Sequence, residues 1–282
     1  MTVLERLRLG QRLQLLLAHL VLLAYMALAL FPVVLVVINS VKTRRAIFQT
    51  PYALPNRDTW DLIGYEKVLD HSNFPDYFLN SIIVTVGALF LILIAGSMAA
   101  WALAEYRFPG NTFMGLYLAL GIMIPIRLGT VSILRLVVRL GLADTLTALI
   151  LIYTASGLPL AIFILTQFMR QVPHDLKDAA RVDGASEYRI YLMTLPLIRP
   201  ALGTVAVFNM IPVWNDLWFP LIIAPSEANK TVTLGAQVFL GQFVNDWNAV
   251  LASLTLAMIP VIILYIIFSR QLIRGLTSGA VK

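Results

Sequence analysis

FLNSIIVTVGALFLILIAGSMAAWALA, at residues 78–104, is an apolar stretch without a single charged side chain. As an α-helix it would extend about 40 Å, more than the roughly 30 Å of a membrane's hydrocarbon core. We therefore expect it to cross a membrane. Five further apolar stretches of the chain have a similar length and lie at about residues 17–39, 112–133, 146–168, 201–223 and 249–269. The sequence thus predicts an all-α membrane protein with six transmembrane helices.

The overall composition agrees with this class. Hydrophobic residues make up 59% of the 282 residues and charged residues only 13%, whereas a soluble domain has about 25% charged residues. The apolar residues form solid blocks, which excludes the short alternating segments of a transmembrane β-barrel. The chain has no cysteine, so it holds no disulfide and no thiolate metal site. We assign the net charge of +6 to loops beside anionic lipid and a cytoplasmic partner, not to nucleic acid.

The distribution of Lys and Arg indicates the orientation. With the N-terminus inside, the cytoplasmic segments contain twelve of the 21 basic residues and the outer loops nine. The excess on the inside favours two cytoplasmic termini. The first apolar stretch is longer than the core of a signal peptide, so we interpret it as a retained span. In this orientation the polar loop at 169–199 is cytoplasmic.

This loop contains the sequence DAARVDGASEYRIYLMTLPLIRP, at residues 178–200. Gly184 can adopt a positive φ and end a helix, and Ser186 can cap the next one. Pro196 can then stop that second helix. The pattern predicts two short helices joined by a tight turn.

Ala179 and Ala180 add little bulk to the first of these helices. An exposed surface of small residues would let another protein approach closely. Basic amphipathic segments also lie on lipid surfaces. From the residues alone, the loop is either a docking element for a protein partner or an amphipathic segment on the membrane.

The same stretch resembles the EAA loop in the membrane subunits of bacterial ABC importers. That motif has an acidic residue, two alanines, a following glycine and a later apolar–proline ending. The matching residues are Asp178, Ala179, Ala180, Gly184, Leu195 and Pro196. The chain departs from the motif in having Asp178 where glutamate is usual.

Other segments are similar to the carbohydrate-uptake branch of this family, and to its second permease of the maltose-transporter MalG type. They are NSIIVTV at 80–86, YRFPG at 106–110, VWNDLWFPLI at 213–222 and RQLIRGLTSGAVK at 270–282. The resemblance implies a single permease domain with the type I ABC importer permease fold and cytoplasmic EAA-loop coupling helices.

The resemblance also implies a function and a set of partners. The chain would be the permease subunit of an ATP-driven, binding-protein-dependent importer of an oligosaccharide, glycoside or polyol. It would form half of the pathway by alternating access, in a bacterial plasma membrane. Its partners would be a homologous second permease, two copies of a P-loop ATPase and an extracytoplasmic sugar-binding protein.

ATP hydrolysis is expected on the partner subunits. None of the sixteen glycines is followed by lysine, so the chain lacks the G-x-x-x-x-G-K phosphate loop. We therefore expect that this chain is no enzyme and binds no cofactor or metal, and that ATP and Mg are bound by the ATPase.

Two segments are implied to contact the ATPase. In the EAA loop these residues are Asp178, Ala179, Ala180, Asp183, Gly184, Ala185, Leu195 and Pro196. In the tail they are Ser278, Gly279, Ala280, Val281 and Lys282, which would reach toward the ATPase dimer interface. The alternative for the tail is a frayed terminus.

Polar residues within the spans mark a candidate substrate pathway. Asp216 is the only carboxylate deep in a predicted span, where a charge costs about 3 kcal/mol unless it faces water or a partner. Amide and aromatic side chains lie near it, as sugar sites commonly combine them. The candidates are Asn80, Asn209, Trp214, Asn215, Asp216 and Trp218. Alternatively, the polar groups bond helix neighbours and the tryptophans form an interfacial belt.

Two further interpretations concern charged residues. We expect Arg127 to snorkel to the outer face. A different class of protein, an ion- or proton-coupled secondary transporter, would use Asp216 as its coupling site. The sequence argues against that class because one buried carboxylate is little for a proton relay and no inverted repeat is visible.

Overall fold

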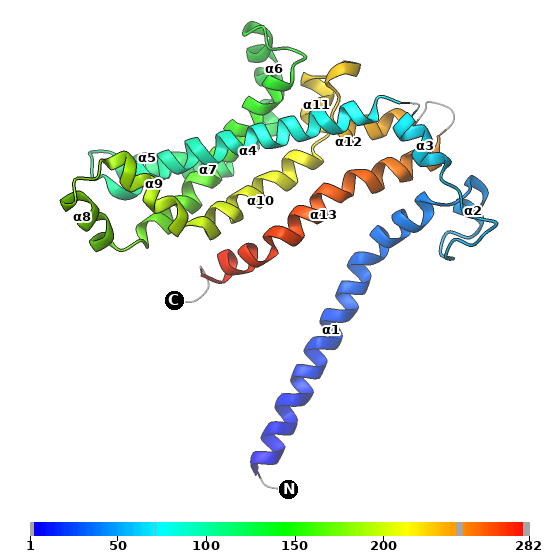
Figure 1. Ribbon diagram of the computed structural model, residues 1–282, viewed down its shortest axis with the longest axis horizontal. Coiled ribbons are helices and arrows are strands. Elements are labelled where there is room, and N and C mark those ends of the chain that lie inside the picture. The colour runs from blue at the N-terminus through cyan, green and yellow to red at the C-terminus, as the bar shows by residue number, and fades with distance from the viewer. Residues whose placement is uncertain (1–2, 71, 241–244, 279–282) are drawn as a thin grey trace. The chain divides into compact units, whose positions relative to one another are not determined.

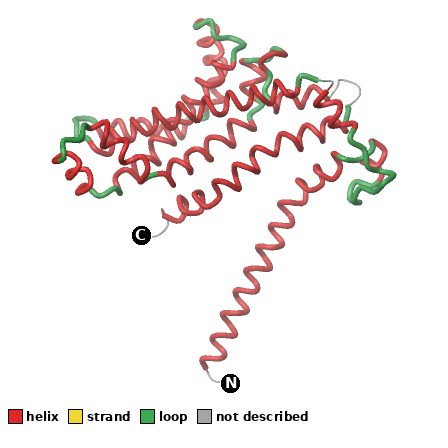
Figure 2. Tube along the Cα trace, in the orientation of Figure 1, coloured by secondary structure: helices red, strands yellow, loops and turns green. Residues whose placement is uncertain are grey.

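The computed structural model describes residues 3–70, 72–240 and 245–278. This part of the chain consists of α-helices, three short 3-10 helices and loops, with two isolated β-bridges and no strand (Figure 2). It divides into two compact units. The first contains residues 1–72 and 239–256, and the second contains residues 73–238 and 257–282.

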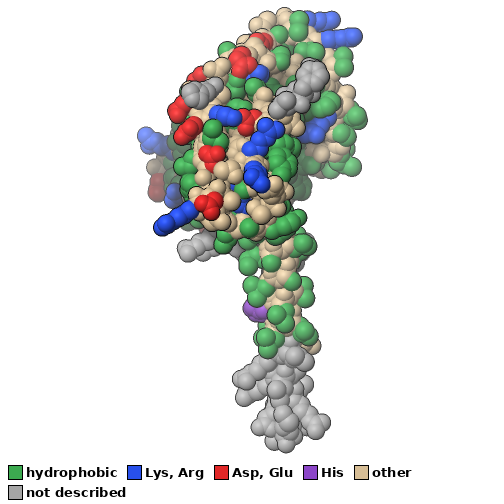
Figure 3. Space-filling model, turned by 90° about the vertical axis from the view of Figure 1, so that its right-hand side faces the viewer, with side chains coloured by type: hydrophobic (Ala, Val, Ile, Leu, Met, Phe, Trp, Pro, Cys, Tyr) green, Lys and Arg blue, Asp and Glu red, His purple; other side chains and the backbone are tan. Residues whose placement is uncertain are grey.

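The first unit contains α1 (Val3–Ser40), α2 (Arg44–Gln49), α3 (Ile63–Asp70) and the start of α13 (Trp247–Ser278). The most apolar 18-residue window of Gln14–Ser40 in α1 has a mean hydropathy of 2.9, and none of its side chains is buried within the chain. Figure 3 shows hydrophobic side chains along the coloured part of this helix. Such a surface is stable against lipid or another apolar helix, as the predicted first span requires.

A buried lysine organises the loop that follows α1. Lys42 is fully buried, and its Nζ donates to the Thr50 carbonyl at 2.9 Å and to Asn39 Oδ1 at 3.2 Å. Burial lowers the pKa of this ammonium below its ordinary value. Asn248 donates to the Lys42 carbonyl at 2.7 Å. These bonds join the loop to the first turn of α13.

The second unit is built on three long helices that run side by side, α4 (Phe74–Glu105), α7 (Leu146–Arg170) and α10 (Arg199–Asn215) (Figure 1). Small residues allow this close packing. A Cβ on Gly96 would lie 3.1 Å from Ala161 Cβ, between α4 and α7. The core between the helices includes Ile92, Ala100, Trp101, Ala161, Leu165, Met169, Ala201 and Val205.

The expected third span, 112–133, is not one helix. α5 (Asn111–Met123) is followed by a 3-10 turn, η1 (Ile126–Gly129), and by α6 (Thr130–Arg139), and the two helical parts are bent by 83°. Pro125 explains the break, because proline disfavours helical geometry in the residue before it and donates no N–H. Ile124 is accordingly extended, with φ −80° and ψ 117°.

The expected fifth span, 201–223, is also interrupted. α10 ends at Asn215, Asp216 is extended with φ −72° and ψ 133°, and α11 (Trp218–Ile223) begins anew. The Asp216 carboxylate accepts the backbone N–H groups of Trp218 and Phe219. An aspartate that caps a following helix in this way competes with continuing the preceding one. Asp216 therefore lies at a break between helices, not within a continuous span as expected.

Among the residues that the structure describes, four helices are long and apolar enough to cross a membrane, or up to six spans result if each bent pair forms one span. The four helices are Gln14–Ser40, Phe74–Glu105, Leu146–Arg170 and Trp247–Ile266. The bent pairs are α5 with α6, and α9 (Glu187–Leu197) with α10. The remaining elements are α8 (His174–Val182), α9 (Glu187–Leu197), η2 (Glu227–Asn229), α12 (Val232–Ala236) and η3 (Gln237–Phe239).

Candidate coupling loop and polar cavity

The polar loop after α7 folds as the two short helices predicted for it, α8 and α9. Gly184 has φ +75°, and its N–H donates to the Arg181 carbonyl at 3.0 Å while that of Ala185 donates to Ala180 at 2.9 Å. This pair of bonds is the Schellman motif that ends a helix at a glycine. Ser186 caps α9 by accepting the Arg189 N–H. The turn preference of Gly184 and the capping preference of Ser186 therefore account for the corner between α8 and α9.

α8 presents two different faces. Its exposed side carries four residues spaced i, i+3, i+4 and i+7, which are Asp175, Asp178, Ala179 and Val182. We call these four residues the docking face. Val182 is 88% exposed although it is apolar. The opposite side is buried and includes Ala180, so only one of the two alanines predicted to form the exposed surface is on it.

Ala180 is buried because it packs into the core of the second unit. Its neighbours in this cluster include Trp101 of α4 and both Ile190 and Tyr191 of α9. Ala185 is half-buried against the same cluster. The small residues of the motif thus serve two purposes, since some form the surface and others let α8 lie flat on the core.

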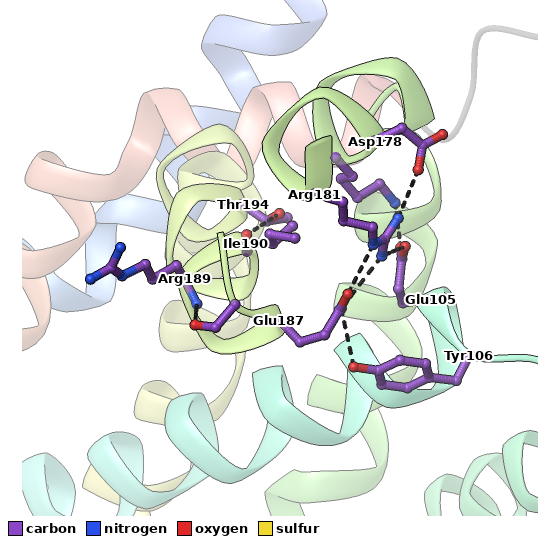
Figure 4. A network of polar contacts seen from close by, with 10 residues as sticks. Glu105, Tyr106, Asp178, Arg181, Glu187, Arg189, Ile190 and Thr194 are labelled. Carbon is purple, nitrogen blue, oxygen red and sulfur yellow. Dashed lines mark hydrogen bonds and ion pairs between the residues drawn. The ribbon is translucent and has the colours of Figure 1, made fainter. Parts of the chain in front are cut away.

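A charge network fixes α8 to the end of α4 (Figure 4). Glu105, the last residue of α4, has a side chain that is only 5% exposed. Its carboxylate accepts from Lys177 Nζ and from Arg181 Nη2, each at 2.6 Å. The Lys177 side chain is equally buried, at 3% exposure. A charge taken out of water in this way is stable only when paired.

Arg181 is the centre of this network. Its guanidinium also donates to Glu187 of α9 and to Asp178, both at 2.8 Å. Glu187, Glu105 and Asp178 together raise the pKa of Arg181 above its usual range. Tyr106 donates its hydroxyl to Glu187 at 3.2 Å. The network therefore joins α4, α8 and α9.

Sequence reasoning missed Glu105. The available signal was an acidic residue directly after the apolar stretch 78–104, together with two basic residues, Lys177 and Arg181, spaced i and i+4 in the polar loop. Each feature is common on its own. Only the fold brings them together.

The other predicted docking residues lie at the corner and at the end of α9. Asp183 and Gly184 are exposed, Leu195 is half-buried and Pro196 is exposed. α9 ends one residue after Pro196, and α10 leaves it at an angle of 74°. Of the predicted tail contacts, Ser278 is the last residue of α13, and residues 279–282 lie outside the described residues.

A cavity of about 650 Å³ opens in the second unit beside the two helix breaks. Its lining includes Pro125, Arg127, Tyr153, Asn209, Pro212 and Asp216. The two carboxylate oxygens of Asp216 accept from the Tyr153 hydroxyl at 2.9 Å and from Arg127 Nη2 at 3.2 Å. Arg127, which we expected to snorkel, is thus turned toward Asp216, although 67% of its side chain remains exposed.

The cavity brings together two of the predicted pathway residues, Asn209 and Asp216. The amide nitrogen of Asn209 donates to a backbone carbonyl one turn earlier, at 2.9 Å. Trp218 donates its indole N–H to Thr130 Oγ1 at 3.0 Å. Asn215 is exposed and bonds to its own helix. Neither Trp218 nor Asn215 lines this cavity.

The remaining two candidates hold neighbouring segments in place. Trp214 is buried and donates its indole N–H to the Ala257 carbonyl at 2.9 Å. Asn80 is buried and donates to the carbonyls of Ala228 at 2.8 Å and Lys230 at 3.0 Å. Both residues thus bond to neighbouring segments, and neither lines this cavity.

Comparison with known proteins identifies the class. Residues 71–278 match the family described as "binding-protein-dependent transport system inner membrane component". The chain belongs to this family. It is therefore a multi-pass membrane permease of a binding-protein-dependent transport system, as the resemblance of its polar loop implied.

Individual relatives resemble the chain over most of its length. It is 31% identical over 268 residues to the diacetylchitobiose uptake system permease protein NgcG of Streptomyces coelicolor, which covers 94% of this chain and 88% of the relative. It is 35% identical over 207 residues to the arabinooligosaccharides transport system permease protein AraQ of Halalkalibacterium halodurans, covering 73% and 74%.

A solved structure confirms the fold. It is that of a bacterial ABC transporter involved in the import of the acidic polysaccharide alginate, and the match has a TM-score of 0.80 at 22% identity. The similarity covers 93% of this chain and 97% of the other. The chain thus has the fold of an ABC importer permease.

Proposed function

We propose that this chain is one permease subunit of an ATP-driven importer for oligosaccharides or related glycosides and polyols, in a bacterial plasma membrane. The two relatives named above are permeases for a chitobiose derivative and for arabinooligosaccharides, which supports a saccharide as the cargo. The chain would pair with a homologous permease, and the two would enclose the pathway. A sugar-binding protein would deliver the cargo from outside.

The docking face is the observation that carries the proposed link to ATP. It combines an apolar side chain, Val182, which is 88% exposed, with the carboxylates of Asp175 and Asp178. An exposed apolar group of this kind favours a protein partner. Anionic lipid would repel the two carboxylates, so the amphipathic-segment alternative is less suitable. A cleft with apolar walls and a basic rim, on an ATPase subunit, fits this face.

Docking of α8 on an ATPase subunit also defines the other parts of the proposed complex. Two ATPase copies would bind ATP and Mg, one of them contacting this chain through α8. Residues 278–282 would extend toward the interface between those copies. In this proposal α8 and both termini would be cytoplasmic, with the loop at 40–77 outside.

The polar cavity is our candidate for this chain's part of the pathway. Asn209 and Asp216 present an amide and a carboxylate at its wall, and both groups can bond sugar hydroxyls. ATP-driven closure of the ATPase pair would displace α8 and so move the helices that line the cavity. Cargo would gain access first from one side of the membrane and then from the other.

An alanine on the docking face provides the test. Ala179 is exposed, so Ala179→Arg places a large charged side chain in the proposed interface without disturbing the core. Ala179→Ser is the matched control, because it changes the same position and keeps the surface small. We expect the arginine variant to reach normal membrane levels, lose the co-purifying ATPase and lose sugar uptake.

The serine variant should retain both the ATPase and uptake. Normal uptake and normal recovery of the ATPase with Ala179→Arg would exclude the docking role. Recovery of the wild-type chain without any ATPase would refute the importer proposal as a whole.

A further inference from the structure

We infer that Glu105 is a positioning residue that transmits displacement of the coupling loop to α4. The inference rests on the proposed function, because it concerns how movement of α8 reaches the pathway. The residues involved are Glu105 at the end of α4 and its two partners on α8, Lys177 and Arg181. None of the three is part of the docking face.

The covalent connections of the loop lead to only two spans. α8 follows α7 across the short link around Pro173, and α9 leads into α10 through Ile198. α4 is connected to neither α8 nor α9 along the chain, although it packs against both α7 and α10. The two 2.6 Å ion pairs of Glu105 link α8 directly to the end of α4.

The geometry of these pairs suits the transmission of force. The carboxylate of Glu105 and the ammonium of Lys177 are 5% and 3% exposed, so water cannot readily replace either partner. Separating them would leave a buried charge without a partner, which is strongly unfavourable. A pair that resists separation moves as one body.

Aromatic contacts beside the Glu105–Lys177 pair also attach α8 and α9 to α4. Lys177 Nζ lies 5.7 Å from the centre of the Trp101 ring, and that ring contacts Tyr191 of α9 edge-on at 6.0 Å. The hydroxyl of Tyr191 is 2.7 Å from Ser97 Oγ. Both helices of the loop are therefore attached to the last turns of α4, the span whose small residues contact α7.

The experiment uses the complete importer in proteoliposomes, with the sugar-binding protein outside and ATP accessible to the ATPase. We would measure sugar transported per ATP hydrolysed. Glu105→Gln keeps the shape of the side chain and removes its charge. Asp76→Asn is the control, since it makes the same type of change at an exposed position near the other end of α4.

We expect Glu105→Gln to retain the ATPase in the complex and to lower the transport ratio roughly threefold or more, in the range by which residues outside binding sites alter coupling. The control should match the wild type. A second variant exchanges the charges, Glu105→Lys with Lys177→Glu. It restores an ion pair, and residue 177 remains one turn from Arg181, so the ratio should recover.

The outcomes distinguish a failure of the role inferred for Glu105 from a failure of the proposed docking. An unchanged ratio in Glu105→Gln overturns it. A lowered ratio that the charge exchange does not recover also overturns it, because the side chain then has only a local packing role. If Ala179→Arg retains the ATPase and uptake, the proposed docking fails first, independently of the Glu105 variants.

Discussion

Replacing Asp216 with alanine would remove the acceptor of four hydrogen bonds at the cavity wall. The donors are the Tyr153 hydroxyl at 2.9 Å, the Phe219 N–H at 3.1 Å, Arg127 at 3.2 Å and the Trp218 N–H at 3.3 Å. A buried donor left without a partner costs about 1–3 kcal/mol. Tyr153 and Phe219 are both buried, whereas Arg127 is exposed to solvent.

We therefore expect Asp216→Ala to destabilise the chain by about 3 kcal/mol, mainly through these two buried donors. Asp216→Asn keeps one oxygen acceptor and should cost about half as much. Tyr153→Phe removes a donor and leaves the carboxylate its other partners, so its effect should be about 1 kcal/mol. Combined with Asp216→Ala, it should be less than additive, because the orphaned hydroxyl is gone.

Thermal unfolding in mild detergent measures these effects. The matched control is Asn215→Ala, at the adjacent exposed residue whose amide bonds only to its own helix. If Asp216→Ala and Asn215→Ala unfold at the same temperature, the bonds at the break do not stabilise the fold and the reasoning is refuted. The same variants test the alternative in which the chain is a proton-coupled secondary transporter that uses Asp216. A proton dependence of uptake that disappears in Asp216→Asn would favour a secondary transporter.

Three further substitutions test close packing, turn geometry and loop attachment. Gly157→Ala should cost about 1–3 kcal/mol, because its Cβ would lie 2.3 Å from Asn209 Oδ1. Gly115→Ala is the matched control: a Cβ at this position of α5 would have no atom within 4 Å, and alanine is the better helix former, so it should not destabilise the chain in the same unfolding assay. Gly184→Val should destabilise the turn by about 1–2 kcal/mol, because an L side chain is strained at the φ of +75° that Gly184 adopts. Faster proteolysis of the loop would reveal this effect. Asn80→Ala should increase hydrogen exchange around Ala228 and Lys230, whose carbonyls Asn80 binds, and unchanged protection there would contradict this role of Asn80.

The parts of the structure that were predictable depend on local chemistry. Gly184 and Ser186 determine the corner of the coupling loop through their own conformational and capping preferences, so sequence alone suffices there. The long apolar helices follow from hydrophobic length in the same way. Which of two neighbouring alanines faces outward was not predictable, because that depends on the packing of α8 against Tyr191 and Trp101.

The two helix breaks within predicted spans have a common physical origin. A stretch of high mean hydropathy does not reveal whether its backbone is continuous. Pro125 breaks one stretch through its missing N–H, and Asp216 ends another by capping the next helix. The carboxylate that we expected deep in a span is thus a structural cap with partners. Glu105 escaped notice because its partners are distant in sequence, and such pairing follows only from the fold.

In the proposed complex, the two faces of α8 would allow partner choice and folding to change independently. Ala180 is constrained by the core that it fills, whereas the side chain of Ala179 is exposed. Substitutions at 179 and at its exposed neighbours can therefore reshape the recognition surface while the scaffold remains the same. A cell with several importers of this kind could keep each permease matched to its own ATPase through a few such positions. The same positions are where an engineer would exchange one ATPase for another.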